Sequence, residues 1–175
     1  MRYLFFIFFY GYQQLCFPQA PANIGVNLPS IALLDVEPKG GTISLKFNKP
    51  SEAGKALQNS ESSDIKWLNF TSALPVGSSR HISVQIASGR LSSGYGIILE
   101  TSGFTGVGAG ILGNSVSHVN LSNSPIRIVD NIGGAFTGDG VNNGYKLKFS
   151  LIINDYSLLK GGSNIYTIIF TLTDN

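Results

Sequence analysis

The chain has 175 residues, of which 43% are hydrophobic and only 13% are charged, and it contains 21 glycines. This composition excludes an intrinsically disordered chain, because enough apolar surface can be buried to offset the entropy of ordering, and the length fits one domain. The net charge of +2 is too small and too dispersed for binding to a nucleic-acid backbone.

The N-terminal residues have the pattern of an export signal. Met1 and Arg2 precede an apolar run over residues 3–10, which is too short to span a membrane as a helix but suits the hydrophobic region of a signal peptide. The triplet Ala20-Pro21-Ala22 then offers a cleavage site with small residues. We therefore predict a signal peptide over 1–22, a single domain over 23–175 without a membrane span, and a secreted or cell-surface location, with the periplasm as one route.

The single cysteine, Cys16, lies inside this predicted leader. A lipidated cysteine is the alternative interpretation, but Gln14 and Leu15 stand where small residues would precede such a cysteine. With cleavage after Ala22 the mature chain has no cysteine, so core packing rather than a disulfide must hold the domain together.

The first segment after the leader alternates between apolar and small or polar residues. Ile24, Val26 and Leu28 alternate until Pro29, and the pattern resumes with Ile31 and Leu33. This segment is either the first strand of a self-complete sheet or a strand free to pair with another chain.

Short segments of period two follow, at residues 43–47, 82–86, 95–99 and 126–128. Such alternation indicates strands with one buried face. Trp67 is predicted to lie in the core, and residues 49–63 are predicted to form a loop with at most one helical turn, because Gly54 and the polar flanks disfavour a longer helix.

The two clearest strands lie near the C-terminus. One has an inward row from Tyr145 to Ile153, and the other has an inward row of Tyr166, Ile168, Phe170 and Leu172. We expect these two strands to pair antiparallel through residues 154–164. With roughly seven to nine short strands and no helical period, the chain is predicted to be all-β, a two-layer antiparallel β-sandwich of immunoglobulin-like type, with a jelly roll or a barrel as alternatives.

Motifs for chemistry are weak. The glycines of residues 108–113 match the dinucleotide-binding pattern, but no helix is predicted after them. His81 and His118 are the only histidines, and no zinc-hydrolase or nucleophile-elbow spacing accompanies them. We therefore predict no catalytic, cofactor-binding or metal residue and no enzyme, and a secreted hydrolase is only a third hypothesis.

Residues 137–144 gather oxygen ligands of the kind that calcium takes, including Asp139, Asn142 and Asn143. Val141 stands where an EF-hand loop needs Asp or Asn, so a turn built from Asx side chains and glycines is favoured over a structural calcium site. Asn69 and Asn120 each begin a triplet that matches the N-glycosylation pattern.

The two terminal segments together resemble the secreted pilin subunits of the chaperone-usher type. In that family an N-terminal donor strand completes the immunoglobulin-like sheet of the next subunit. The resemblance implies donor-strand candidates Ile24, Val26, Leu28, Ile31 and Leu33, and an acceptor groove lined by Tyr166, Ile168, Phe170 and Leu172. The chain departs from the family in ending Thr173-Asp174-Asn175, where an aromatic residue is usual near the C-terminus, and in lacking a disulfide.

The expected function is therefore that of an exported, fimbrial or pilin-like structural subunit of the cell surface, which assembles or adheres through β-strand complementation. Its expected partners are further copies or other surface subunits. The alternative is a monomeric secreted adhesin or carbohydrate-binding module, in which exposed aromatics such as Tyr156 beside Asp155 would contact a glycan.

Overall fold

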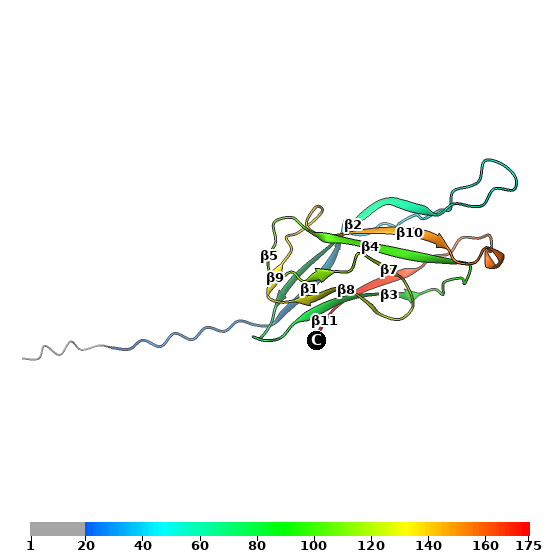
Figure 1. The fold of residues 1–175 in the computed structure, drawn as a ribbon. Helices are drawn as coiled ribbons and strands as arrows, with labels where there is room; N and C mark the ends of the chain where they lie inside the picture. The colour runs from blue at the N-terminus through cyan, green and yellow to red at the C-terminus, as the bar shows by residue number, and fades with distance from the viewer. Residues whose placement is uncertain (1–19) are drawn as a thin grey trace, which may run out of the picture.

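The computed structural model describes residues 20–175, so residues 1–19 of the predicted signal peptide lie outside the described part. Figure 1 shows an elongated β body from which residues 20–30 extend as a single length of chain. The strands are β1 (Ile31–Glu37), β2 (Ser60–Ala73), β3 (Arg80–Ser88), β4 (Tyr95–Thr105), β5 (Ala109–Gly110), β6 (Asn114–Ser115), β7 (His118–Asn120), β8 (Ile126–Ile132), β9 (Ala135–Phe136), β10 (Gly144–Ile153) and β11 (Thr167–Asp174).

Two antiparallel sheets pack face to face, which confirms the predicted β-sandwich. The seven-stranded sheet has the order β5-β9-β2-β10-β4-β7. β9 and β10 pair with one edge of β2, and β1 pairs with the opposite edge. The four-stranded sheet has the order β11-β3-β8-β6. Among residues 20–175 the only helical element is a single 3₁₀ turn, Tyr156–Leu158, and no helix there is long and apolar enough to cross a membrane.

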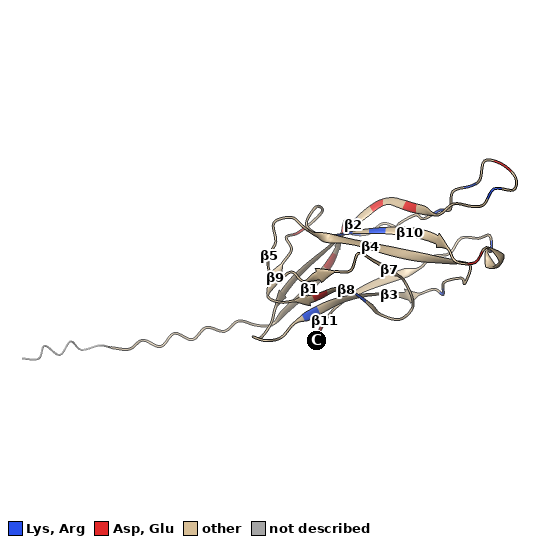
Figure 2. Cartoon of the chain, viewed as in Figure 1, with Lys and Arg blue, Asp and Glu red and all other residues tan. Residues whose placement is uncertain are grey.

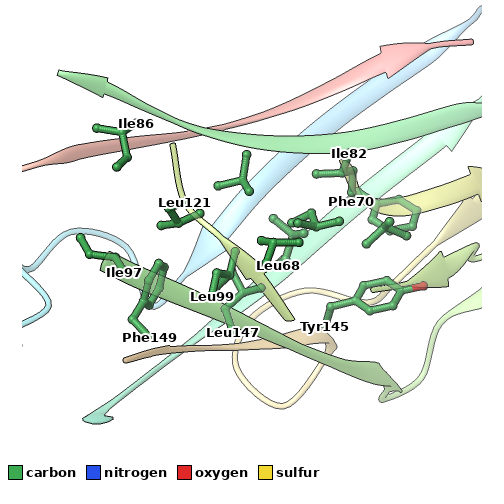
Figure 3. Close-up of a cluster of buried hydrophobic side chains, with 14 of the residues drawn as sticks. Leu68, Phe70, Ile82, Ile86, Ile97, Leu99, Leu121, Tyr145, Leu147 and Phe149 are labelled. Carbon is green, nitrogen blue, oxygen red and sulfur yellow. The ribbon is translucent and has the colours of Figure 1, made fainter. Parts of the chain in front are cut away.

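The core lies between the two sheets and is built from the inward rows of the long strands (Figure 3). Along β10 the predicted alternation is confirmed, since Tyr145, Leu147 and Phe149 are buried while Lys146 and Lys148 are half-exposed. These side chains face a row on the opposite sheet that is equally buried: Ile82, Val84, Ile86 and Ile128. Packing of apolar side chains from both layers is the main force that holds the sheets together.

Trp67 does not lie in the core. Its neighbours Leu68 and Phe70 are buried, while Trp67 is half-buried. Since successive strand residues point to opposite faces, Leu68 occupies the inward position that Trp67 would need.

The predicted pairing of the two C-terminal strands is wrong. β10 lies between β2 and β4, whereas β11 pairs with β3 in the other sheet. The connection over residues 154–166 crosses from one layer to the other, and the Asp155 carboxylate caps its 3₁₀ turn by accepting from the Ser157 amide. Alternation identifies the buried face of a strand, but the partner strand depends on contacts that are distant in sequence.

Residues 41–48 form an extended segment without a strand ladder, although a short strand was predicted over 43–47. Ile43, Leu45 and Phe47 are half-buried against the core and alternate with exposed residues, so the inward row exists. The segment's bonds to the chain near β2 are an isolated bridge between Asn48 and Gln58 and the hydrogen bond from the Ser60 hydroxyl to the Lys46 carbonyl. It therefore follows the edge of the body without being paired along its length.

Candidate strand-acceptor groove

A groove lined by both apolar and charged side chains runs between β1 with the segment that follows it, on one side, and β11 on the other. It has a volume of about 330 Å³, and seven residues line it: Leu34, Asp35, Val36, Lys39, Gly40, Ile168 and Phe170. β1 is an edge strand of the larger sheet, and β11 is an edge strand of the smaller one. The groove is thus the place where the two layers of the sandwich open at one side.

The backbone on both sides of this opening has free hydrogen-bonding groups. Within residues 20–175, β3 is the only strand paired to β11, so the other edge of β11 is unpaired. In the segment that follows the lining residue Gly40, the Lys46 carbonyl accepts from the Ser60 hydroxyl, and no other backbone group of residues 42–47 bonds within the described chain. Such edges are templates for an added strand.

The apolar face of β11 is only partly covered. Ile168, Phe170 and Leu172 are half-buried, whereas Ile82 and Val84, on the adjacent strand β3, are at most 1% exposed. Tyr166, just before β11, is also half-buried, so the four predicted acceptor residues share one row beside the groove. A row that packs against the core on one side and remains open on the other lacks a covering element.

Two polar clusters lie at the two ends of β11, one on each side of the groove's lining. At the end where β11 begins, the Tyr95 hydroxyl lies 2.5 Å from that of Tyr166 and accepts from the Asn164 amide at 3.0 Å. Tyr95 also packs edge-on against Phe47, with ring centroids 6.1 Å apart. Burial, followed by the hydrogen bond with Tyr95, raises the pKa of Tyr166 to about 12. Tyr95 therefore links the two sides of the groove at this end.

At the other end, Arg80 joins four parts of the chain. Its side chain is only 4% exposed, and its guanidinium donates to the backbone carbonyl of Ile31, to the Ser72 and Ser30 hydroxyls, and to the Asp174 carboxylate. The N-terminal extension leaves the body here. Arg80 thus fixes the start of β1, the end of β2 and the end of β11 around one buried cation.

A charged pair lies in the lining of the groove. The Lys39 ammonium is 2.9 Å from the Asp35 carboxylate. The hydrogen bond from Lys39, together with that from the Val36 amide, lowers the pKa of Asp35 below its ordinary value. Elsewhere, in the view of Figure 2, the charged residues are few and dispersed along the body.

The predicted donor residues fall into two groups. Ile24, Val26 and Leu28 are 86%, 89% and 76% exposed, in the extended segment that precedes the body (Figure 1). Ile31 and Leu33 instead belong to β1, where they pair with Ala73 and Thr71 of the same chain. Leu33 points away from the core, because Leu34 and Val36 occupy the inward positions. Among the described residues, the structure therefore limits the segment outside the body to those before Ile31.

The other candidate sites have structural roles. The Asn143 amide donates to the Asp139 carbonyl at 2.7 Å and its oxygen accepts from the Val107 amide, while Asn142 has a φ of 64°. These bonds fit the predicted Asx turn, and no group of three or more His, Cys, Asp or Glu among residues 20–175 could hold a metal ion. The glycines of residues 108–113 include β5, where a Cβ on Gly110 would lie 2.1 Å from the Gly134 carbonyl, so glycine permits close pairing with β9.

The remaining predicted residues are also engaged within the fold. His81 bonds to Asn175 and His118 to Ser117, in different sheets. The Tyr156 hydroxyl accepts from the Leu57 amide, so this exposed ring joins the 3₁₀ turn to the loop that precedes β2. Of the two glycosylation triplets, Asn69 is buried, and its amide donates to the Asn143 carbonyl, whereas Asn120 is exposed.

The fold and the groove together define a β-sandwich with an unpaired strand edge beside a partly covered apolar face. Comparison with models of known protein families, with curated proteins and with solved structures finds no match to this chain. Of the residues around the groove, the β11 row was predicted from its period. Leu34 and Val36 were not predicted, because the sequence pattern placed Ile31 and Leu33 on the apolar face of this strand. Nothing in the sequence around Arg80 signals that this residue is buried.

Proposed function

We propose that this protein is an exported structural subunit of a surface fibre, in which each copy inserts residues 23–28 into the groove of the next copy. The observation that carries the proposal is that one chain has both an exposed apolar segment and an apolar strand face that is only partly covered. Three apolar side chains at alternate positions are exposed before the body, and an apolar row of β11 beside an unpaired edge lacks a cover. We assign no enzyme activity and no cofactor to it.

The strand order supports this proposal. An immunoglobulin-like sandwich has one sheet of strands A, B, E and D and another of strands C, F and G. The order β1-β2-β10-β4 corresponds to A-B-E-D, and the pair β3-β11 corresponds to C-F, with β8 and β6 added beyond β3. In this correspondence the G strand would lie on the free edge of β11, which borders the groove.

The chemistry of the extension suits that position. An added strand gains backbone hydrogen bonds to both sides of the groove, and its alternate side chains fill the apolar space. Ile24, Val26 and Leu28 share one face, and each would gain about 1.5–3 kcal/mol by burial. Pro29 lacks an amide hydrogen and ends the pairing directly before the body.

Deletion of residues 23–30 tests the proposal. Size-exclusion chromatography and electron microscopy should show assemblies for the full mature chain and only folded monomers for the deletion variant. The body should keep its circular dichroism spectrum, because Ile24, Val26 and Leu28 are exposed outside it.

A pair of point variants gives the matched comparison. Val26→Asp places a charge on the face that enters the groove and should abolish assembly, since burying an unpaired carboxylate is costly. Asn27→Asp places the same charge one residue later, on the opposite face, and should leave assembly within a few-fold of the parent chain. Equal effects of the two variants, or unchanged assembly after the deletion, would exclude the proposed strand donation.

A further inference from the structure

We infer that successive copies also contact each other end to end, with the turn around Val76 of the donating copy packed against Ile165 of the accepting copy. This inference rests on the proposed function and goes beyond it, because it names a second interface outside the groove. It follows from the direction of β11, from the length of chain between the extension and β1, and from the exposure of the two ends.

The first step is the direction in which the strand inserts. β11 begins at Thr167, beside the Tyr95 and Tyr166 hydroxyls, and ends at Asp174, beside Arg80. The extension leaves its own body at the Arg80 end, since Ser30 and Ile31 both bond there. For copies to add head to tail, the inserted strand must leave the accepting groove at the Thr167 end, and so it runs antiparallel to β11. The opposite direction would bring two Arg80 ends together, which gives closed pairs rather than a growing chain.

The second step is the length of the connection. Only Pro29 and Ser30 separate Leu28 from β1. Three Cα steps span at most about 11 Å. Pro29 restricts its own φ, and the Ser30 hydroxyl is fixed by donating to the Ala73 carbonyl at 3.2 Å. With Leu28 seated in one body and Ile31 in the next, the facing ends of the two bodies must touch.

The third step is what lies at those ends. Val76 is fully exposed in the turn between β2 and β3, three residues after Ala73, which pairs with Ile31 at the base of the extension. Ile165 is 83% exposed and directly precedes Tyr166, at the mouth through which the inserted strand leaves. These two side chains therefore flank the crossing point from opposite copies.

Further apolar side chains surround the crossing point on both ends. At the Arg80 end, where Val76 lies, Val107, Phe136 and Val141 are also exposed. At the Thr167 end, where Ile165 lies, Tyr156 and Leu158 are exposed. Exposed apolar groups gathered at both ends of a body are typical of an interaction surface. Two different ends that meet form a heterologous interface, which generates an open filament.

Disulfide trapping tests this contact. In a chain carrying Cys16→Ser, the double variant Val76→Cys/Ile165→Cys should form a ladder of covalent oligomers on mild oxidation, because the two Cβ atoms must approach within about 4.5 Å for a disulfide. The matched control Val76→Cys/Glu100→Cys moves the second cysteine to the exposed middle of β4. We expect at least tenfold more cross-linked oligomer from the first variant, on denaturing gels without reductant.

The outcomes separate this contact from the proposed strand donation. Fibres without cross-links in the Val76→Cys/Ile165→Cys variant would overturn the end contact and leave strand donation intact. Covalent dimers from Val76→Cys alone would overturn it as well, since they indicate that two Arg80 ends meet. If the parent chain forms no assemblies, both proposals fail together. Both positions are exposed, so circular dichroism of each variant should match the parent.

Discussion

At the scale of single residues, Arg80 joins the starts and ends of several strands, although no sequence motif marks it. Its guanidinium is nearly inaccessible, yet its charged partner Asp174 is 74% exposed. The ion pair itself is therefore screened by solvent and contributes little. The larger effect comes from the buried Ser72 hydroxyl and the partly buried Ile31 and Ala73 carbonyls, to which Arg80 donates.

Arg80→Ala should lower the free energy of unfolding by about 2–3 kcal/mol, because it leaves buried acceptors without a donor. Asp174→Asn should cost less than about 1 kcal/mol, since that carboxylate is exposed. Urea denaturation followed by circular dichroism measures both values. The matched control is Arg127→Ala, which removes an exposed ion pair with Asp130 at 3.0 Å and should also cost less than about 1 kcal/mol. A loss from Arg80→Ala no larger than that from Arg127→Ala would contradict the role given to Arg80.

Tyr145 gives the fold a dependence on alkaline pH. Its ring is buried between Phe70 and Phe104, and its hydroxyl donates to the Leu112 carbonyl at 2.8 Å. Burial raises the pKa of Tyr145 from 10.0 to about 12. Because the folded pKa lies above the unfolded value, the neutral phenol contributes stability that is complete below pH 10 and is lost as the pH rises toward 12.

Tyr145→Phe should therefore reduce the loss of stability across this pH range by an amount on the order of 2 kcal/mol. It should also cost about 1 kcal/mol at neutral pH through the lost hydrogen bond. The dependence should not vanish, since Tyr166 also has a pKa raised to about 12. Denaturation midpoints measured from neutral pH upward give both effects. Identical pH profiles for the variant and the parent chain would show that Tyr145 is not responsible.

At the scale of elements, β11 and residues 42–47 are incomplete in the same way. Each has an apolar row turned toward the core and a backbone edge without a partner in the described chain. The missing element must be a strand, because only a strand bonds to two edges and fills alternate side-chain positions. β11 ends at Asp174, so a strand that followed it through a tight turn would run antiparallel along its free edge.

Moving residues 23–30 from the N-terminus to a position after Asn175, through a short glycine-containing turn, should make the subunit complete. We expect the free energy of unfolding to rise, because the added strand buries three apolar side chains and pairs with the free edge of β11. Assembly should be lost, since the groove is filled within the copy. The control carries Val26→Asp in the moved segment and should show neither the added stability nor a filled groove. Stability equal to that of the simple deletion variant would argue against the groove as the acceptor.

At the scale of the whole molecule, the two ends of the body have different tasks. The Arg80 end holds the base of the extension, and the end with Tyr95 and Tyr166 bounds the groove where an incoming strand would leave it. This polarity follows from the antiparallel pairing of β11 with β3, which places the start and end of β11 at opposite ends of the body. Under the proposed strand donation, a subunit built in this way would add copies in one direction only.

The sequence alone determined the class of fold and the inward rows of several strands. Alternation along β10 and β11 predicted which side chains face the core, because a period of two follows from strand geometry whatever the partner strand is. The same argument identified Ile24, Val26 and Leu28 as an apolar row. It could not say that these residues lie outside the body while Ile31 and Leu33 lie within β1.

Only the tertiary structure decided the pairing of the strands and the existence of the groove. The separation of β10 and β11 into different sheets, the burial of Arg80 and the open edge of β11 all depend on contacts between residues far apart in the chain. Local periodicity carries no record of such contacts, because the free energy that selects them comes from the packing of both layers at once. The sequence thus specifies which strand faces are apolar and must be buried. The fold specifies that, in the described chain, the apolar face of β11 is the one left partly exposed.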